Sequence, residues 1–220
     1  MRLVVVGGVA GGMSAAARAR RLDETAEIIV LDRGEHVSFA NCGLPYFVGG
    51  EIENQQSLLV QTPASLKAAL DLDVRVRHDV TALDTAARTL TVLTETGTEQ
   101  LSYDALILSP GALAVRPPLP GLDSPRVHTL RTVEDATTLR TVVTAGARRA
   151  VVLGGGFIGI EAAEALRAQG TPVRGAHVLQ QVLHHLAAAL FGDQKLVTLL
   201  AGTVVGDTKI QHVPRELNAA

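Results

Sequence analysis

The amino-acid sequence predicts an α/β fold in which two similar modules follow one another, each opening with a strand, a glycine-rich turn and a helix. The first module has an aliphatic run at 3–6, glycines at 7, 8, 11 and 12, and an Ala/Arg-rich helical stretch at 13–22. The second has an aliphatic run at 150–153, glycines at 154–156 and a helical stretch at 157–169. A strand, helix and second strand within about 30 residues form a βαβ motif, whose strands are parallel. Both modules are therefore predicted to be tandem Rossmann-like dinucleotide-binding domains.

The composition favours a globular protein with an aliphatic core. Hydrophobic residues make up 47% of the 220-residue chain and charged residues 19%, whereas disordered chains are poor in apolar residues and rich in charge. Four Phe, two Tyr and no Trp leave Val, Leu, Ile and Ala to fill the core, as in buried parallel sheets. We therefore expect well-packed parallel sheets.

Charge and hydropathy exclude several classes of partner. A net charge of −2 supplies no field that would gather nucleic acid or an anionic membrane surface, so neither is an expected partner. No apolar segment approaches the roughly 20 residues that span a bilayer, and the N-terminal run meets glycines at once, unlike a signal peptide. A soluble cytoplasmic protein is expected.

The other elements of the first module follow from aliphatic runs and turn residues. We expect a second strand at 27–31 that ends at Asp32, half-exposed strands at 74–77 and 89–94 joined by a turn at 84–87, and a buried strand at 105–108. Three prolines at 116–121 exclude a helix or central strand there, so this segment is a stiff connector at or near a domain boundary.

The second module is expected to be incomplete. A helix is predicted at 132–143, but no aliphatic strand ending in a ribose-binding residue follows Gly170. Beyond residue 178 the sequence offers a helix-like patch at 181–191 and modest aliphatic runs at 196–200 and 203–205.

The first glycine turn is a variant of the dinucleotide-binding pattern G-x-G-x-x-G. Gly7 and Gly12 occupy its outer positions, and Val9 stands at the middle one. The pattern provides a tight turn, close approach to a pyrophosphate and a helix N-terminus that receives negative charge. Asp32, about 20 residues past Gly12, is placed to bind ribose hydroxyls. The alternative is that these glycines only let a helix and a strand pack closely.

The second glycine turn matches the pattern at every position, with Gly154, Gly156 and Gly159 after an aliphatic strand. Packing glycines are again the alternative. Two dinucleotide sites in one chain favour a flavin, FAD, that receives hydride from a nicotinamide cofactor, NAD(P)H.

Cys42 is the only cysteine, which excludes an internal disulfide and a zinc site built on several cysteines. It lies in the segment SFANCGLPY, in which Gly43 and Pro45 suit the start of a helix. A thiol at a helix N-terminus is stabilised as the nucleophilic thiolate. The alternative is a buried thiol that fills space; next to a predicted flavin, a reactive thiol is favoured.

Four segments, VVVGGVAGG, SFANCGLPY, LSYDALILSPGA and GGGFIGIEAAEAL, together resemble the single-cysteine branch of the pyridine nucleotide-disulfide oxidoreductases, within it the coenzyme A-disulfide reductases. The resemblance covers residues 1–173. It implies an FAD domain with an inserted NAD(P)H domain, and a C-terminal dimerisation domain that makes the family's full-length members homodimers. Because the chain is shorter than those members, we assign 1–146 to the first segment of the FAD domain and 147–220 to an incomplete NAD(P) domain, and expect the dimerisation domain to be missing.

The resemblance also implies roles for individual residues. Cys42 would be catalytic. The cofactor-binding residues would be Gly7, Gly8, Val9, Ala10, Gly11, Gly12, Asp32, Arg33, Gly111, Gly154, Gly156, Phe157, Ile158, Gly159 and Glu161. The substrate-binding residues, facing coenzyme A, would be Ser14, Arg18, Arg21, Ser38 and Asn41, although arginines on a solvated helix face are the simpler reading of the first helix. Leu70 stands where the family has a lysine, so one phosphate contact is expected to be absent.

Further residues of the resemblance have simpler structural readings. Tyr103, Asp104 and the Ser109-Pro110-Gly111 turn resemble the family's second flavin-domain signature, or are a strand followed by a turn. His177 stands at the position expected to bind the ribose or its phosphate. His184 and His185 are adjacent and are taken as surface residues, so no metal site is expected.

The chemistry of a single thiol leaves two enzymatic readings and one that is not catalytic. The dithiol members pair two cysteines five positions apart, but Val37 and Phe47 flank Cys42 at that spacing. A lone thiol beside a flavin cycles through a mixed disulfide or through a sulfenic acid. The family's NADH oxidases and peroxidases have a histidine where this chain has Ala10, which favours reduction of coenzyme A disulfide, a persulfide or a polysulfide. The third reading is an inactive nucleotide-binding fragment.

Overall fold

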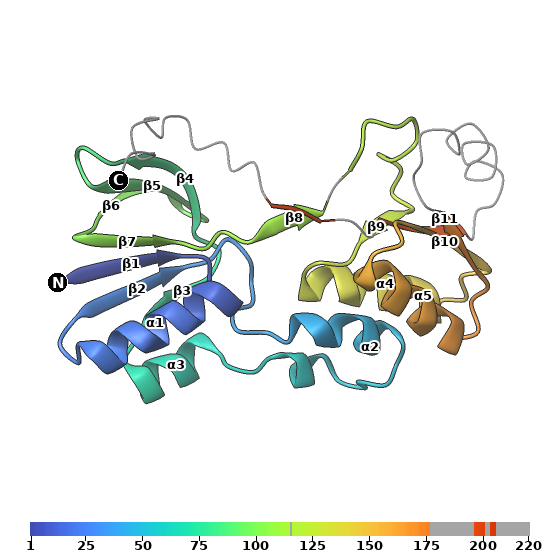
Figure 1. Cartoon of the computed structure of the whole chain (residues 1–220), viewed down its shortest axis with the longest axis horizontal. Helices are drawn as coiled ribbons and strands as arrows, with labels where there is room; N and C mark the ends of the chain where they lie inside the picture. The colour runs from blue at the N-terminus through green and yellow to red at the C-terminus, as the bar shows by residue number, and fades with distance from the viewer. Residues whose placement is uncertain (115, 177–195, 201–202, 206–220) are drawn as a thin grey trace. The chain divides into compact units, whose positions relative to one another are not determined.

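The computed structural model describes residues 1–114, 116–176, 196–200 and 203–205 and contains two compact units (Figure 1). Unit 1 comprises Met1–Phe39 and Leu59–Gly111, and unit 2 comprises Ala40–Leu58 and Ala112–Val205. Unit 2 thus includes a short segment that lies, in sequence, inside unit 1. The assignment of 1–146 and 147–220 to two cofactor domains stays a prediction.

Unit 1 is organised around a four-stranded parallel sheet with the order β3-β2-β1-β7. Its strands are β1 (Arg2–Val6), β2 (Glu27–Leu31), β3 (Asp73–Arg75) and β7 (Ala105–Leu108). Helix α1 (Ala10–Leu22) connects β1 to β2, so the βαβ motif predicted from the glycine turn is confirmed.

The two faces of this sheet are covered differently, because alternate residues of each strand point to opposite sides. Leu3, Val5, Ile28 and Val30 pack with residues of helices α1 and α3 (Pro63–Leu70). On the opposite face, Val4, Ile29 and Leu31 pack against Leu90 and Val92 of strand β5 (Thr89–Thr94). All of these side chains are buried, and together they fix the ends of the strands from which the site is built.

The antiparallel sheet on that second face corrects one expectation. Its order is β4 (Asp79–Asp84), β5, β6 (Gly97–Ser102). The turn at 84–87 joins β4 to β5, rather than joining a strand at 74–77 to the one at 89–94. The segment at 74–77 instead contributes to β3, which pairs with β2 in the parallel sheet. Both β4 and β6 expose most of their residues to solvent and were not predicted, because they carry too few apolar residues to show a pattern.

Unit 2 contains a second parallel sheet, with the order β11-β10-β12-β9. Its strands are β9 (Val127–Thr129), β10 (Arg149–Leu153), β11 (Val173–Ala176) and β12 (Leu196–Leu200). Helix α5 (Phe157–Ala168) connects β10 to β11, and helix α4 (Val133–Thr144) precedes β10. A separate antiparallel pair joins β8 (Ala112–Ala114) to β13 (Thr203–Val205). The connector at 116–121 lies within unit 2 and, where described, holds no helix or strand.

The segment that carries Cys42 belongs to unit 2 as a short helical insertion. It contains the 3₁₀ turn η1 (Asn41–Gly43), the helix α2 (Leu44–Val48) and the 3₁₀ turn η2 (Gln55–Leu58). Helix α2 packs against α4 and α5. The predicted helix start at Gly43 and Pro45 is therefore confirmed, although the helix is only five residues long.

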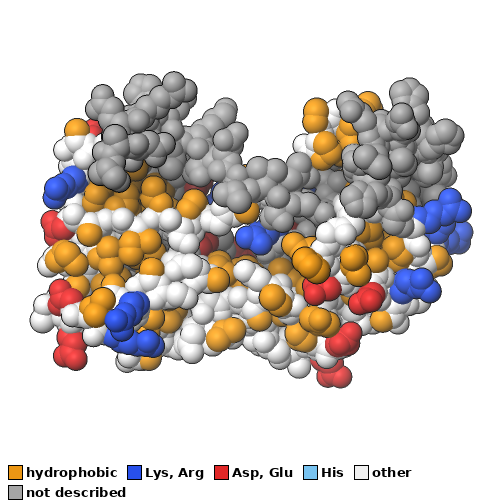
Figure 2. Space-filling model, in the orientation of Figure 1, with side chains coloured by type: hydrophobic (Ala, Val, Ile, Leu, Met, Phe, Trp, Pro, Cys, Tyr) orange, Lys and Arg blue, Asp and Glu red, His pale blue; other side chains and the backbone are white. Residues whose placement is uncertain are grey.

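The face of unit 1 that Figure 2 draws carries charged and hydrophobic side chains. Acidic and basic side chains both reach the visible face of unit 1, with hydrophobic ones between them (Figure 2). Among the described residues, none of the helices is both long enough and apolar enough to span a bilayer. The helix expected at 181–191, together with His177, His184 and His185, lies outside the described residues.

Candidate functional site

The first glycine turn is fixed by close backbone packing. Gly7 has a φ of +105°, and a Cβ atom built on it would lie 1.9 Å from the carbonyl oxygen of Ser109. A Cβ atom on Gly12 would lie 1.7 Å from the carbonyl oxygen of Gly7. Such contacts are forbidden, so both positions require glycine for the fold itself. The turn thereby brings the end of β1, the start of α1 and the end of β7 together.

The two helices that follow the glycine turns lack the N-terminal caps that the other long helices have. Neither α1 nor α5 has a side-chain cap or an acidic residue in its first turn. Helices α3 and α4 each begin with a full capping box, built by Thr62 with Ser65 and by Thr132 with Asp135. The first N–H groups of α1 and α5 therefore have no side-chain acceptor, which is the condition for binding phosphate at a helix N-terminus.

Asp32 lies at the end of β2 and is tied to the first glycine turn. One carboxylate oxygen accepts the backbone N–H of Gly8 at 2.6 Å, and the other accepts the N–H of Gly34 at 2.7 Å. The carboxylate is partly buried at the edge of the sheet, where the strands end. Its position matches the role of a ribose-binding acid, and Arg33 follows it on the exposed surface.

The remaining residues of the first turn lie close to Asp32 and to the end of β7. Val9 is the N-cap residue of α1, and Ala10 is exposed in the first turn. Gly11 lies beside Ser109, since a Cβ atom there would approach the Ser109 hydroxyl at 2.5 Å. The backbone N–H of Ser38 donates to the carbonyl of Gly8. Unit 1 therefore brings together Gly7–Gly12, Asp32, Ser38 and the turn after β7.

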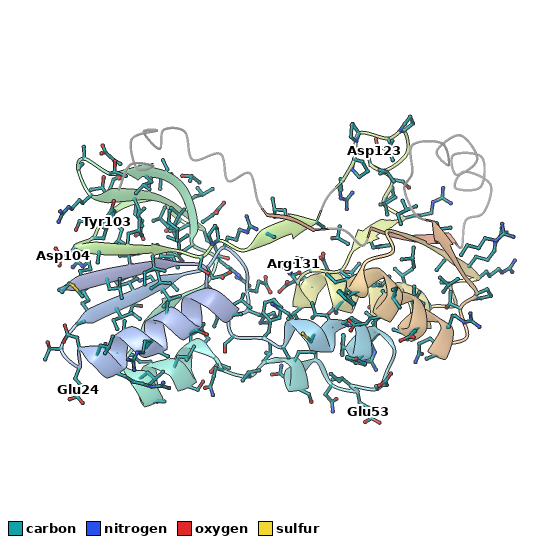
Figure 3. All side chains as sticks on the ribbon, in the orientation of Figure 1. Glu24, Glu53, Tyr103, Asp104, Asp123 and Arg131 are labelled. Carbon is teal, nitrogen blue, oxygen red and sulfur yellow. The ribbon has the colours of Figure 1, made fainter. Side chains whose placement is uncertain are left out.

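The residues of the signature around β7 make structural contacts. Asp104 accepts the backbone N–H of Arg2 at 2.6 Å, and its own N–H donates to the carbonyl of Arg2, which joins β7 to the start of β1 (Figure 3). Tyr103 packs partly buried against the core that β5 completes. At the other end of the strand, Gly111 has a φ of +72°, a conformation that favours glycine.

The second glycine turn is open to solvent. Gly154 has a φ of +113°, while a Cβ atom on Gly156 would meet no atom within 4 Å. The first turn of α5 exposes Phe157 by 88% and Ile160 by 53%, whereas Gly159 is buried. Ile158 and Glu161 are partly exposed on the same helix. An apolar surface beside an uncapped helix start suits a ligand with both an anionic and a flat apolar part.

Cys42 is exposed, in the 3₁₀ turn that leads into α2. The neighbouring Asn41 side chain buries its Oδ1 atom without a hydrogen-bond partner among the described residues. Gly43 is buried, and a Cβ atom built on it would come within 2.9 Å of the Leu58 side chain. The cysteine is therefore accessible, and it precedes a short helix in which all residues except Tyr46 are buried.

The residues predicted to face coenzyme A on α1 form one exposed face. Ser14, Arg18 and Arg21 are spaced by four and three residues, so they lie on the same side of the helix. Neither guanidinium has a hydrogen bond or an ion pair among the residues that the structure describes. The neighbouring Arg20 is different, because it donates to the backbone carbonyls of Leu70 and Asp71. Arg20 therefore has a structural role.

A pocket of about 440 Å³ in unit 1 was not predicted. It borders the loop after Asp32 and is lined by Glu35, His36, Val76, Arg77, Thr94, Glu95 and Thr96. Arg77 donates to Glu95 at 2.7 Å and to Glu35 at 2.9 Å, and these contacts raise the pKa of its guanidinium. No sequence pattern could have revealed this pocket, because its charged residues come from three separate segments of unit 1.

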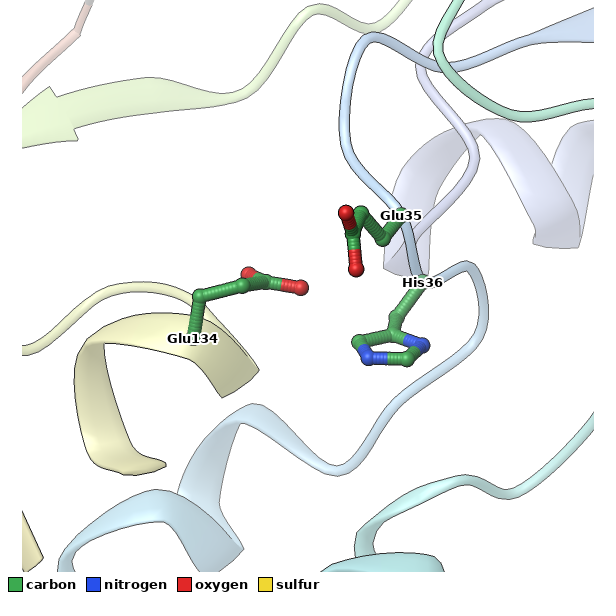
Figure 4. Close-up of side chains that lie close together, drawn as sticks. All are labelled: Glu35, His36 and Glu134. Atoms are coloured by element: carbon green, nitrogen blue, oxygen red, sulfur yellow. The ribbon is translucent and has the colours of Figure 1, made fainter. Parts of the chain in front are cut away.

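Figure 4 draws two of these pocket residues, Glu35 and His36, on the loop after β2, and Glu134 in the first turn of α4. The first two belong to unit 1 and the third to unit 2. Taken separately, neither unit gathers three metal-ligating side chains from this set.

The two parallel sheets, the glycine turns and the accessible cysteine place the chain in a known class. The chain belongs to the pyridine nucleotide-disulphide oxidoreductases, whose family model matches residues 1–196. Among its relatives is the coenzyme A disulfide reductase of Staphylococcus haemolyticus, which is 39% identical over 221 residues; the match covers 99% of this chain and 47% of the relative.

Two solved structures extend the comparison. The reduced CoADR-RHD of Bacillus anthracis is 40% identical, with a TM-score of 0.79 over 90% of this chain and 38% of that one. An NAD-dependent persulfide reductase from A. fulgidus is 30% identical, with a TM-score of 0.82 over 92% of this chain and 46% of that one. The chain thus spans less than half the length of each of these relatives.

Proposed function

We propose that this chain carries the nucleotide-binding and thiol-bearing part of an oxidoreductase that reduces coenzyme A disulfide, or a related persulfide or polysulfide, at the expense of NAD(P)H. The observation that carries the proposal is Cys42, the only cysteine of the chain, which is exposed just before the short helix α2, whose Leu44, Pro45, Phe47 and Val48 are buried. Support comes from the relatives, which include a coenzyme A disulfide reductase and a persulfide reductase.

The two units are proposed to be tandem dinucleotide-binding domains. Unit 1 would hold FAD through the first glycine turn and Asp32, and the residues present suit that group. The start of α1 is uncapped and glycine-lined, and the Asp32 carboxylate is held at the strand ends. Unit 2 would hold NAD(P)H at the uncapped start of α5, with Phe157 and Glu161 beside it.

Cys42 would perform the thiol chemistry. Its thiolate attacks one sulfur of coenzyme A disulfide; a bond forms between Cys42 and that sulfur, the substrate's own S–S bond breaks, and one coenzyme A thiolate leaves. FAD, when bound, would supply the two electrons, taken from NAD(P)H, that reduce this mixed disulfide and restore the Cys42 thiolate with release of the second coenzyme A. Because no second cysteine is present, the chain itself cannot form an internal disulfide.

Coenzyme A would be bound by polar side chains of two segments. Arg18 and Arg21 present guanidinium groups without partners among the described residues, which suits bidentate binding of phosphate, and Ser14 lies on the same face. Ser38 and Asn41 precede the cysteine, and their polar side chains would complete the set that faces coenzyme A. Dimerisation through a domain found in longer members is part of this proposal.

The test has two parts on the purified chain. A visible absorption spectrum is expected to show bound flavin that NAD(P)H bleaches. Cys42→Ser is expected to keep the flavin and its bleaching but to abolish NAD(P)H-dependent reduction of coenzyme A disulfide. If Cys42→Ser kept full disulfide turnover, the assignment of Cys42 would be wrong. A colourless protein would reduce the proposal to a nucleotide-binding fragment, and oxygen or peroxide consumption in excess of disulfide turnover would favour an NADH oxidase or peroxidase.

A further inference from the structure

The segment that carries Cys42 cannot hold its own position. Helix α2 has five residues, and so short a helix is not stable alone, since helix nucleation costs more than one turn returns. It also ends at two glycines, Gly49 and Gly50, the second with a φ of +82°. The position of the Cys42 backbone therefore depends on the contacts that the rest of unit 2 makes with α2 and the residues after it.

Two side chains from elsewhere in unit 2 hold the segment after α2. Arg140 of helix α4 donates to the carbonyl of Ile52 at 2.8 Å. Gln169, the C-cap residue of α5, donates through its side-chain amide to the carbonyl of Gly49. Both acceptors are carbonyl groups at or just beyond the helix end, which the helix itself leaves without an intrahelical donor.

Arg140 also makes the contact that reaches into α2. Its Cζ atom lies 4.4 Å from the centroid of the Phe47 ring, within the range of a cation–π interaction. Phe47 is 5% exposed, so the ring is enclosed and fixed by its neighbours. One arginine therefore contacts the segment on both sides of the glycine pair, at Phe47 and at Ile52.

Phe47 stands five residues after Cys42, in the helix that follows the cysteine directly. Its buried ring lies under the Arg140 guanidinium and anchors this helix. The backbone from Cys42 to Phe47 is a single 3₁₀ turn and helix, which transmits a displacement of the anchor to the cysteine.

We propose that Arg140 is a positioning residue for Cys42, acting through the Phe47 ring and the Ile52 carbonyl to hold the thiol-bearing segment in one orientation. This inference rests on the disulfide reductase function proposed above. Arg140 itself has no role in the chemistry, and its effect is on the step in which the Cys42 thiolate must meet a disulfide sulfur in line. Misplacement by about 1 Å can lower such a rate by as much as 10²-fold.

The test compares Arg140→Met with Arg167→Met, a matched control in the last turn of α5, where Arg167 is exposed. Hydrogen exchange followed by mass spectrometry is expected to show amides of 41–52 exchanging about tenfold faster in Arg140→Met, with strands β1 and β2 unchanged. The rate of alkylation of Cys42 by iodoacetamide, read at the chain's single thiol, is expected to change about threefold or more.

Steady-state kinetics distinguish a positioning role of Arg140 from a general effect on the stability of unit 2. With coenzyme A disulfide as substrate, Arg140→Met is expected to lower kcat about tenfold and to leave KM within about twofold. Arg140→Lys, which keeps the cation and a donor, is expected to recover most of the loss. If Arg140→Met does not fold, Phe47→Leu, which removes the ring but leaves the hydrogen bond to Ile52, is judged by the same criteria.

The proposal is overturned if Arg140→Met matches Arg167→Met in exchange at 41–52 and in alkylation of Cys42. It is also overturned if exchange accelerates equally in β10 and α5, because Arg140 would then only stabilise unit 2 as a whole. Should the unsubstituted chain fail to reduce coenzyme A disulfide, the proposed function fails, while exchange and alkylation still decide whether Arg140 positions the segment.

Discussion

The two glycine turns differ in what their glycines are for. In the first turn, Gly7 and Gly12 are demanded by the protein's own backbone, because Cβ atoms there would lie 1.9 and 1.7 Å from carbonyl oxygens. In the second turn, Gly154 requires its positive φ, but Gly156 faces open space and has an ordinary extended conformation. Strict packing thus falls on the outer positions Gly7 and Gly12 of the first turn, whereas the middle position of the second turn, Gly156, is sterically open.

This comparison shows that a glycine pattern mixes two requirements. Glycines that the fold needs say nothing about a ligand, whereas a glycine that the fold does not need is a better indicator of close approach by one. By this criterion Gly156 is the more informative residue for nucleotide binding, and Asp32 with the uncapped start of α1 is the better indicator in the first turn.

The largest effect is expected for Gly12→Ala. Its methyl group would meet the Gly7 carbonyl, which is backbone and cannot move aside, so we expect a loss of about 3 kcal/mol or more in the free energy of unfolding. Gly11→Ala in the same turn is the control, because only the Ser109 hydroxyl would have to rotate. Urea denaturation of both variants measures the difference, and equal losses would show that the strict packing of this turn is wrongly inferred.

The next largest effect is expected for Asp32→Asn. Each carboxylate oxygen of Asp32 accepts one backbone N–H, so an amide would turn its NH₂ group against one of these donors, at a cost of about 1–3 kcal/mol. Asp84→Asn is the matched control, because one oxygen of Asp84 accepts both of its N–H donors and survives the substitution. Thermal unfolding of the two variants gives the comparison, and a stable Asp32→Asn would contradict the role of Asp32 in fixing the first turn.

Gly156→Ala is expected to affect binding rather than folding. The residue is the N-cap of α5 with open space around its Cα, so the free energy of unfolding is expected to change by less than about 1 kcal/mol. Affinity for NAD(P)H is expected to fall about tenfold, equivalent to about 1.4 kcal/mol. Fluorescence titration with NADH and NADPH measures it, and unchanged affinity would mean that this turn does not approach the cofactor.

The smallest effect is expected from His128 in strand β9. Burial, reinforced by the positive charge of Arg116 and opposed by Asp135, lowers the pKa of His128 below 6.5. The unfolded chain then takes up the proton first as pH falls, so His128 contributes stability at pH 7 and above that is lost as pH falls through 6.5 toward the lower folded pKa. The free energy of unfolding of the unsubstituted chain and of His128→Asn is measured at pH 7.5 and at pH 5.5, and the unsubstituted chain is expected to lose more stability between them. An equal loss in both proteins would contradict this role of His128.

Local sequence pattern predicted the central strands of both parallel sheets, but it did not predict β9, and it was wrong to expect no strand after Gly170, where β11 lies. The strands at β1, β2, β7 and β10 read directly from aliphatic runs. Strands β1, β2 and β10 are largely buried on both faces, whereas β7 is partly buried and exposes Leu108 by 44%. The exposed strands β4 and β6 escaped prediction because only tertiary pairing with β5 makes them strands. Strand β11 begins beside Pro172 and contains Arg174 and Gly175, and its pairing with β10 determines its conformation more than its composition does.

The candidate site was predictable where it rests on local sequence and not where it rests on distant contacts. Gly7, Asp32 and Cys42 stand out by residue type and spacing, and the structure places the first two together in unit 1. Arg140 could not be found in this way, because its contact with Ile52 joins residues 88 positions apart. No family pattern quoted for the chain includes it.

The placement of the Cys42 segment in unit 2 also has a consequence for synthesis of the chain. Gln169 and Gly49, which hydrogen-bond in the finished fold, are 120 positions apart. At about 5–20 residues per second, a ribosome needs roughly 6–24 s to make that stretch. Until α4 and then α5 have been made, the chain's only thiol stands on a nascent segment that lacks these neighbours. The segment that carries Cys42 is thus made early and held in position late, so its accessible thiol meets cellular oxidants and disulfides before α4 and α5 restrain that segment.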